Sequence, residues 1–336
     1  AMVSPKMRLA VGALFFLATG CSTVEYLWQA GRGQLSLVNR ARPLGEVIAD
    51  ETTPPRIREL LREVPRVKAF GERLGMKATS NYEEYVRLDR DAVVYVVSAC
   101  HPLRFEPKEW KFPILGWYSR EGADRHASRL RSENLDVDVR GAPAYSTLGW
   151  FNDPILSTMI YGDERALGEL VDVILHESLH ATAYVNHQAF FNESVASFVA
   201  EGMTPIYLRE TRGPGSPEEK AYVAGLARQK EYGAKMHAAY EELDLVYRSH
   251  QSDAEKVARK EAVFARLRRE LGWRADRDLN NATLLGFREY EGNRDAFTRM
   301  FAKCGNDWPR FLGAMAKVEE RDFGARQTKN LDAVEA

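Results

Sequence analysis

The apolar positions between residues 165 and 184 recur every three or four positions, which predicts an amphipathic helix. The stripe consists of Leu167, Leu170, Val171, Ile174 and Ala181. Leu175 and Leu179 add apolar surface beside it. A helix that is apolar on more than one side is expected to lie inside the core.

Ahead of this helix the pattern favours strands. Residues 92–99, a stretch near Leu115, residues 135–139 and residues 144–149 are strand candidates, with a helix over 125–133 between them. The segment that follows residue 20 is mainly helical in pattern for some 80 residues. Its best helix opens at Thr53 and Pro54, and Pro65 is expected to kink or break it before its end near Gly75.

After the apolar helix the pattern predicts a helical hairpin. Ser216 and Pro217 open a long helix to about His250, and Ser252 with Glu255 forms a capping box for another that ends at Gly272. The fold class expected is therefore α+β, with a small mixed sheet and a mainly helical C-terminal half.

Composition adds little to this picture. The 336 residues are 45 % hydrophobic and 28 % charged with a net charge of -1, as in an ordinary globular chain. The arginine-rich stretch over 259–269 alternates with glutamate and apolar residues, as a solvated helix face does. No nucleic-acid role is indicated.

The apolar helix carries His176-Glu177-Ser178-Leu179-His180, which is the main chemical signal in the chain. On a helix the two histidines lie one turn apart on one face, with a carboxylate beside them. A buried histidine pair needs a compensating partner, and Zn²⁺ is the natural one. The alternative is two histidines that happen to be four positions apart.

A second predicted helix offers Glu193 as a third ligand, after a break at residues 186–188. Two histidines and a glutamate around one zinc ion leave a fourth position open for water, as a catalytic site requires. A set of three histidines would need one at position 186, where Asn186 stands, whereas His187 comes one residue later.

This set predicts amide hydrolysis. Zinc lowers the pKa of a bound water and polarises a carbonyl, and Glu177 can accept the proton and pass it to the leaving amine. Asn192 or Glu201 is a candidate to orient the histidine rings.

The chain resembles the bacterial predicted-aminopeptidase lipoprotein family. The resemblance rests on residues 142–154 (Ala-Pro-Ala-Tyr-Ser-Thr-Leu-Gly-Trp-Phe-Asn-Asp-Pro), on the zinc motif, and on Phe191-Asn192-Glu193-Ser194, a gluzincin pattern. Shorter blocks at 33–35, 42–43, 109–116 and 280–282 extend it from about residue 20 to 315. It implies a zincin-like fold and a zinc-dependent aminopeptidase. The run over 117–123 departs from the family pattern, so the substrate preference stays open.

In zinc peptidases of this architecture an edge strand beside the active helix pairs with an extended peptide. Residues 144–149 are the candidate strand, and Tyr145, Gly149 and Asp153 are candidates to contact the substrate. Asp153 would do so by binding the amine of the substrate. The alternatives are that Asp153 and Pro154 only form a turn, and that Tyr145 and Trp150 are packing residues.

Related zinc peptidases stabilise the oxyanion with a tyrosine or histidine that follows the third ligand. Tyr290 is the candidate, with Tyr240 and His237 as competitors. The alternative for Tyr290 is a core residue whose hydroxyl is satisfied.

The N-terminus resembles a bacterial lipoprotein signal. Lys6 and Arg8 precede an apolar run over 9–18 that is too short to span a bilayer, and small residues lead to Cys21. Lipid on Cys21 would anchor the protein to the cell envelope, in the family's hosts to the outer membrane facing the periplasm. Leu17 lies four rather than three residues before the cysteine, and a secretory signal with a later cleavage site is the alternative.

Two cysteines remain, Cys100 and Cys304, which either form one disulfide or stay as free thiols. The expected organisation is a signal over 1–20, a helical segment over 21–90, a zincin-like core over 91–205, a helical subdomain over 206–326 and a flexible tail over 327–336. The expected function is removal of N-terminal residues from peptides. An envelope endopeptidase and a non-catalytic zinc-containing binding lipoprotein are the alternatives, and the oligomeric state is open.

Overall fold

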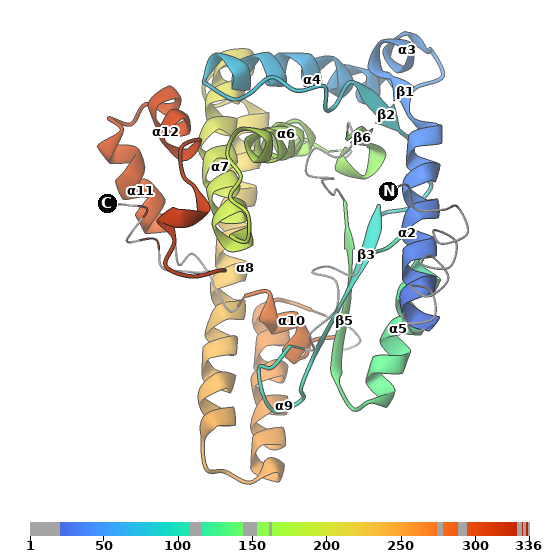
Figure 1. Ribbon diagram of the computed structural model, residues 1–336, viewed down its shortest axis with the longest axis vertical. Coiled ribbons are helices and arrows are strands. Elements are labelled where there is room, and N and C mark those ends of the chain that lie inside the picture. The colour runs from blue at the N-terminus through green and yellow to red at the C-terminus, as the bar shows by residue number, and fades with distance from the viewer. Residues whose placement is uncertain are drawn as a thin grey trace, which may run out of the picture.

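The computed structural model describes residues 21–107, 116–143, 153–160, 163–273, 278–287 and 294–327, together with Leu331 and Val334. Helices predominate, and two small sheets accompany them (Figure 1). The expected α+β class is therefore confirmed. Among these residues, the helices are all too short or too polar to cross a bilayer.

Helices α6 (Ala166–Thr182) and α7 (Ala189–Arg212) pack against each other in the main core. α6 buries the apolar side chains that its sequence predicts, including Leu170, Ile174 and Leu179, all less than 1 % exposed. Each such side chain contributes about 1.5–3 kcal/mol when it is fully buried. This burial fixes the rotation of α6 about its axis and so decides which side faces away from the core.

Helix α4 (Pro55–Arg73) crosses α6 at one end of the molecule (Figure 1). It continues through Pro65, so the expected break is absent. Pro65 lies on the exposed side, whereas Leu61, Val64 and Val67 are buried on the other side and hold the two halves of the helix together. Tertiary packing outweighs the loss of one helical hydrogen bond here.

The strands form two sheets in the described structure, where the sequence suggested one. In the first, β1 (Arg42–Pro43) is antiparallel to β2 (Glu84–Val86), and β2 is parallel to β6 (Ile155–Leu156). In the second, β3 (Val94–Cys100) lies between β4 (Gly116–Trp117) and β5 (Asp136–Ala142), all antiparallel. The strand candidate over 144–149 lies outside the described residues.

The N-terminal part of the chain supplies helices that lie next to the two sheets. α2 (Cys21–Arg40) and α3 (Leu44–Ala49) precede α4, and α5 (Arg120–Ser132) packs on β3 and β5. α5 starts five residues earlier than the pattern predicts because Ser119 caps it, accepting a hydrogen bond from the Gly122 amide at 3.1 Å.

The predicted helical hairpin is confirmed as α8 (Pro217–Arg248) and α9 (Asp253–Glu270). Ser216 and Ser252 cap the two helices, the latter in a capping box with Glu255. The far half of the hairpin has its own apolar cluster, which includes Leu243 and Phe264. Figure 1 shows this half extending away from α6, beside the short helix α10 (Asn281–Leu285).

The C-terminal helices return to the main core. α11 (Arg294–Lys303) and α12 (Trp308–Met315) pack on α7 around Phe198, which lies 5.6 Å from Phe311 between ring centroids. Short 3₁₀ turns occur at Ser157–Met159 and Glu320–Asp322. The main core therefore runs from α2 to α12, and the expected boundary at 205/206 falls inside α7.

Both remaining cysteines are free thiols, so the possible disulfide is not formed. Cys100 is buried at the end of β3, and Cys304 follows α11 in a different part of the fold. Burial, together with the charge of Asp136, raises the pKa of Cys100 to about 12.

Asn281 joins the second sheet to the hairpin. Its side chain is fully buried, donates to the carbonyls of His101 and Pro102 at 3.0 Å, and accepts from the hydroxyl of Tyr247 at 2.8 Å. Lys260 and Asp136 form an ion pair beside it, at 2.5 Å. A buried polar junction of this kind is stable only when each member has its partner.

We expect Asn281→Ala to lower the free energy of unfolding by about 2–4 kcal/mol, because two carbonyls and one hydroxyl lose their buried partner. Urea denaturation measures the loss. The control is Asn39→Ala, at an exposed position of α2. Equal losses in the two variants would contradict the role given to Asn281.

Candidate metal centre

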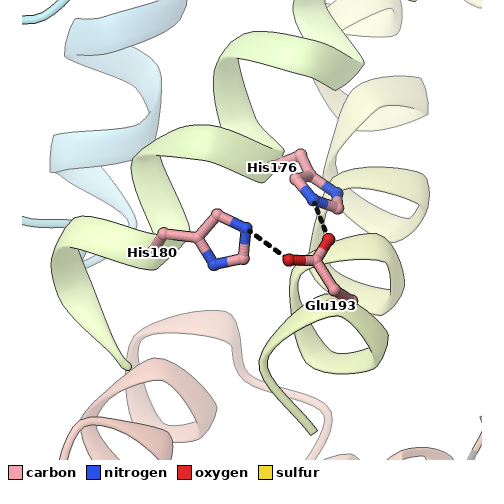
Figure 2. Close-up of side chains that lie close together, drawn as sticks. All are labelled: His176, His180 and Glu193. Atoms are coloured by element: carbon pink, nitrogen blue, oxygen red, sulfur yellow. Dashed lines mark hydrogen bonds and ion pairs between the residues drawn. The ribbon is translucent and has the colours of Figure 1, made fainter. Parts of the chain in front are cut away.

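His176 and His180 lie on one face of α6, one turn apart. Their ring centroids are 5.0 Å apart and the rings are nearly perpendicular. The apolar face of α6 is buried in the core, so the periodicity that predicts the helix also places both rings on the side toward α7. Figure 2 shows both rings pointing toward α7.

Glu193 reaches the two rings from the first turns of α7 (Figure 2). Its Oε2 lies 3.3 Å from Nε2 of His176, and its Oε1 lies 3.5 Å from Nε2 of His180. One donor atom from each of the three side chains lies within 4.8 Å of the others. The structure thus brings together all three side chains that the sequence suggests as ligands.

The three side chains differ in exposure. His180 is 5 % exposed and His176 20 %, whereas Glu193 is 64 % exposed. The cluster is therefore enclosed on the side of α6 and open to solvent on the side of Glu193. A ligand from solvent can reach the cluster there.

The pKa values of the three groups follow from this arrangement. Burial lowers the pKa of His176, but the hydrogen bond with Glu193 and the charges of Glu177, Glu193 and Asp172 outweigh it, so the pKa is raised. Burial and the charge of His176 lower the pKa of His180. Burial raises the pKa of Glu193, but the two histidines outweigh it and the pKa is lowered.

A divalent metal binds an ionised carboxylate and neutral imidazoles. The lowered pKa values of Glu193 and His180 favour that state, whereas the raised pKa of His176 means that a metal must displace a proton from this ring. Two imidazole nitrogens and a carboxylate oxygen suit zinc, and three protein donors leave a further position for a water. The residues present therefore fit this ion.

Glu177 follows His176 on α6 and one of its carboxyl oxygens is buried. Its negative charge acts on both His176 and Tyr82. This carboxylate thus lies near the cluster, and its role as a base stays a prediction.

Asn192 fixes the loop between α6 and α7. Its side chain donates to the carbonyl of Val185 at 2.8 Å and accepts from the amide of Val185 at 2.9 Å. Glu193 is the next residue, so these hydrogen bonds fix the position of its backbone and thus the point from which its side chain extends. The amide of Asn192 is thus engaged by the loop, and the ring-orienting role suggested by the sequence stays a prediction.

Residues 325–327 form hydrogen bonds with the same loop, at residues 187–189. Gln188 donates to the carbonyl of Ala325 at 2.7 Å, and the side chain of Gln327 accepts from the amide of Ala189 at 3.1 Å. The amide of Gln327 donates to the carbonyl of His187 at 2.8 Å. The start of α7 is therefore held from two directions.

Glu201, the other candidate to orient a ring, lies two turns beyond Glu193. It forms an ion pair with Arg294 of α11. Burial is the main cause of the raised pKa values of Asp172 and Tyr222, and the charge of Glu201 adds to it. Glu201 forms no hydrogen bond or ion pair with His176 or His180 in the described structure.

Asp153 is buried two residues before β6, with 5 % of its surface exposed. Its carbonyl accepts from the amide of Tyr82 at 2.7 Å, and its amide donates to the side chain of Asn81 at 3.1 Å. The contact with a substrate amine that the sequence suggested for Asp153 stays a prediction.

Tyr82 is a residue that the sequence did not single out. It has a left-handed backbone with φ of 65°, and its side chain is 4 % exposed. Burial, then the charges of Glu177 and Asp153, raise its pKa well above the usual value, so it stays a protonated phenol beside Glu177. A single tyrosine in an irregular segment has no periodicity that could reveal it.

Other candidates lie elsewhere. Tyr145, Gly149 and Tyr290 are outside the described residues. His237 and Tyr240 are on α8, where Tyr240 packs against Phe105 with ring centroids 4.2 Å apart, and neither belongs to the cluster on α6 and α7. Cys21 is the first residue of α2.

Comparison with known proteins gives one result. A family model described as "Putative aminopeptidase" matches residues 25–330. The chain belongs to this family. Neither the curated proteins nor the solved structures yielded a match. The family supports the aminopeptidase-like resemblance over most of the chain, and with it a peptidase activity.

We expect Asn192→Ala to lower the local opening free energy of the loop by about 2 kcal/mol, because two hydrogen bonds to Val185 are lost. Hydrogen exchange at the amide of Val185 measures the change. Ser194→Ala, two positions along on the same helix, is the control. Unchanged exchange in Asn192→Ala would show that the loop is fixed by other contacts.

Proposed function

We propose that this protein is a zinc-dependent aminopeptidase of the gluzincin type, with a zincin-like catalytic core. His176, His180 and Glu193 bind one Zn²⁺ ion, and Glu177 is the general base. The observation that carries the proposal is the convergence of these three donors from two adjacent helices, with Glu177 beside them. Membership of the aminopeptidase family supports the choice of a peptide as substrate.

Zinc, when bound, supplies Lewis acidity to a water and to the scissile carbonyl. Glu177 accepts a proton from the attacking water and donates it to the leaving amine. The raised pKa of Tyr82 keeps its hydroxyl protonated, so it stays neutral beside the ionised base. Tyr290 remains the candidate to donate a hydrogen bond to the oxyanion.

The free amino terminus of the peptide is the group that distinguishes an aminopeptidase from an endopeptidase. Tyr145, Gly149 and Asp153 are the proposed substrate contacts, on the segment that would pair with an extended peptide. An envelope endopeptidase is the second candidate, because Glu193 is exposed to solvent on one side of the cluster.

A non-catalytic zinc protein is less well supported. A structural zinc site is closed by four protein ligands, whereas this cluster has three donors among the described residues and an exposed side. A structural site also has no use for a carboxylate in the position of Glu177.

We also propose that lipid on Cys21 anchors the protein to the cell envelope, at the periplasmic face of the outer membrane. α2 starts at Cys21, and one face of this helix docks on the protein through Gln29, which bonds with both Gly116 and Tyr118. The other face exposes Trp28 (73 %), Leu35 (64 %) and Val38 (53 %). A lipid on Cys21 would hold this apolar face near the bilayer.

Glu177→Gln is expected to lower peptide turnover by a factor of about 10²–10⁴ while one zinc per chain is retained, because only the proton acceptor is removed. Turnover is measured by mass spectrometry on a peptide library, with and without a chelator. Each peptide is tested with a free and with an acetylated amino terminus. Glu210→Gln, at an exposed position of α7, is the control.

Stepwise removal of residues from free amino termini alone is the expected result. Internal cleavage of acetylated peptides would favour the endopeptidase. Turnover that survives both the chelator and Glu177→Gln would refute the zinc mechanism.

Cys21→Ser is expected to move the protein from the membrane fraction to the soluble fraction of bacterial cells, because a serine cannot carry the lipid. Fractionation and the intact mass of the purified protein measure the change. Cys304→Ser is the control. A wild-type protein without added lipid mass would contradict the anchor.

A further inference from the structure

A tyrosine beside the metal cluster is exposed to solvent. Tyr184 follows the C-terminal end of α6, and its ring is nearly perpendicular to that of His180, with 6.1 Å between the ring centroids. His180 contacts His176 in the same edge-to-face manner, at 5.0 Å. The three rings, four positions apart in the sequence, therefore contact one another in turn, and Tyr184 is at one end.

Tyr184 is far more exposed than the residues on either side of it. It is 43 % exposed, whereas Ala183 and Val185 are 4 % and 3 % exposed. The other large apolar side chains that are exposed in the described structure lie on α2, α8 and α9. Packing in the core accounts for Ala183 and Val185, but it does not account for the exposed ring between them.

The backbone holds Tyr184 from both sides. The amide of Ala183 donates to the carbonyl of Leu179 at 2.8 Å, and both backbone groups of Val185 bond with the side chain of Asn192, at 2.9 and 2.8 Å. The position of Tyr184 is thus set before any ligand arrives. An aromatic side chain on a fixed backbone loses little conformational entropy when it binds a partner.

Tyr184 is close enough to the cluster to touch a peptide that is bound there. Successive residues of an extended peptide are about 3.3–3.6 Å apart. A peptide whose scissile bond lies at His180 therefore brings a neighbouring side chain within reach of a ring 6.1 Å away. A tyrosine ring offers apolar surface to that side chain while its hydroxyl stays in water.

We propose that Tyr184 is a specificity-determining residue, whose ring contacts an apolar side chain next to the scissile bond of the substrate. The inference rests on the proposed peptidase function and names the class of peptide that the site prefers. Burial of apolar surface between the ring and an aliphatic side chain favours such peptides. A peptide with a short polar side chain at that position gains little from the ring.

The test compares peptides that differ only at a residue next to the scissile bond, leucine in one and serine in the other. The two residues that flank the bond are varied in turn. At one of these positions, Tyr184→Ala is expected to lower kcat/KM for the leucine peptide by about 5–20-fold, mainly through KM, and for the serine peptide by less than about twofold. Tyr184→Phe, which keeps the ring, is expected to stay within about twofold of the wild type with both peptides.

A second readout is independent of turnover. Calorimetry on Glu177→Gln measures binding of the same peptides, and the added change Tyr184→Ala is expected to weaken binding of the leucine peptide alone. Zinc per chain is measured in every variant. Tyr184→Gln, which replaces the ring by a polar side chain that can still cover His180, is expected to lose the same selectivity and to retain zinc.

Trp28→Ala is the matched control, because it removes an aromatic ring that is 73 % exposed on α2. It should leave the preference for leucine over serine and the zinc content unchanged.

An unchanged preference for leucine in Tyr184→Ala and Tyr184→Gln would overturn the inference alone. Loss of zinc from both variants would also overturn it, because Tyr184 would then support His180. An equal loss in Tyr184→Phe and Tyr184→Ala would assign the effect to the hydroxyl and would likewise overturn the contact with the ring. A wild-type protein that binds no zinc or cleaves no peptide would instead overturn the proposed function, and this inference with it.

Discussion

The packing of α6 against α7 is the constraint on which the site depends. α6 supplies both imidazoles and α7 supplies the carboxylate, so neither helix holds three donors by itself. Burial of Ile174 and Leu179 on one helix, and of Val195 and Val199 on the other, fixes both the distance and the rotation of the pair. The polar cluster is thus a consequence of the apolar one.

The helices that the sequence predicted well are those with strong local signals. α6 has an uninterrupted apolar period, and α8 and α9 have serine caps at their first turns. The approach of Glu193 to the histidine pair could also be anticipated, because a short loop between two helices leaves few ways to arrange them.

The parts that the sequence did not reveal depend on contacts between distant segments. β1 and β6 are two residues long and pair with β2 from opposite sides, so neither has a period of its own. Tyr222 donates a hydrogen bond to Asp172, which lies 50 positions away in the sequence. The only feature of the local sequence that relates to this contact is Gly168, a glycine inside the apolar helix α6. Pro65 does not break α4, because packing on one side of the helix overrides a local preference.

The hydrogen bonds between residues 325–327 and the loop before Glu193 have a consequence for folding during synthesis. Ala325 and Gln327 leave the ribosome more than a hundred residues after Gln188 and Ala189, to which they are hydrogen-bonded. Until they arrive, the nascent chain can already bury α6 and α7, yet the turn that aims the carboxylate lacks its outer support. The start of α7 therefore reaches its final set of hydrogen bonds only after residues 325–327 have been made.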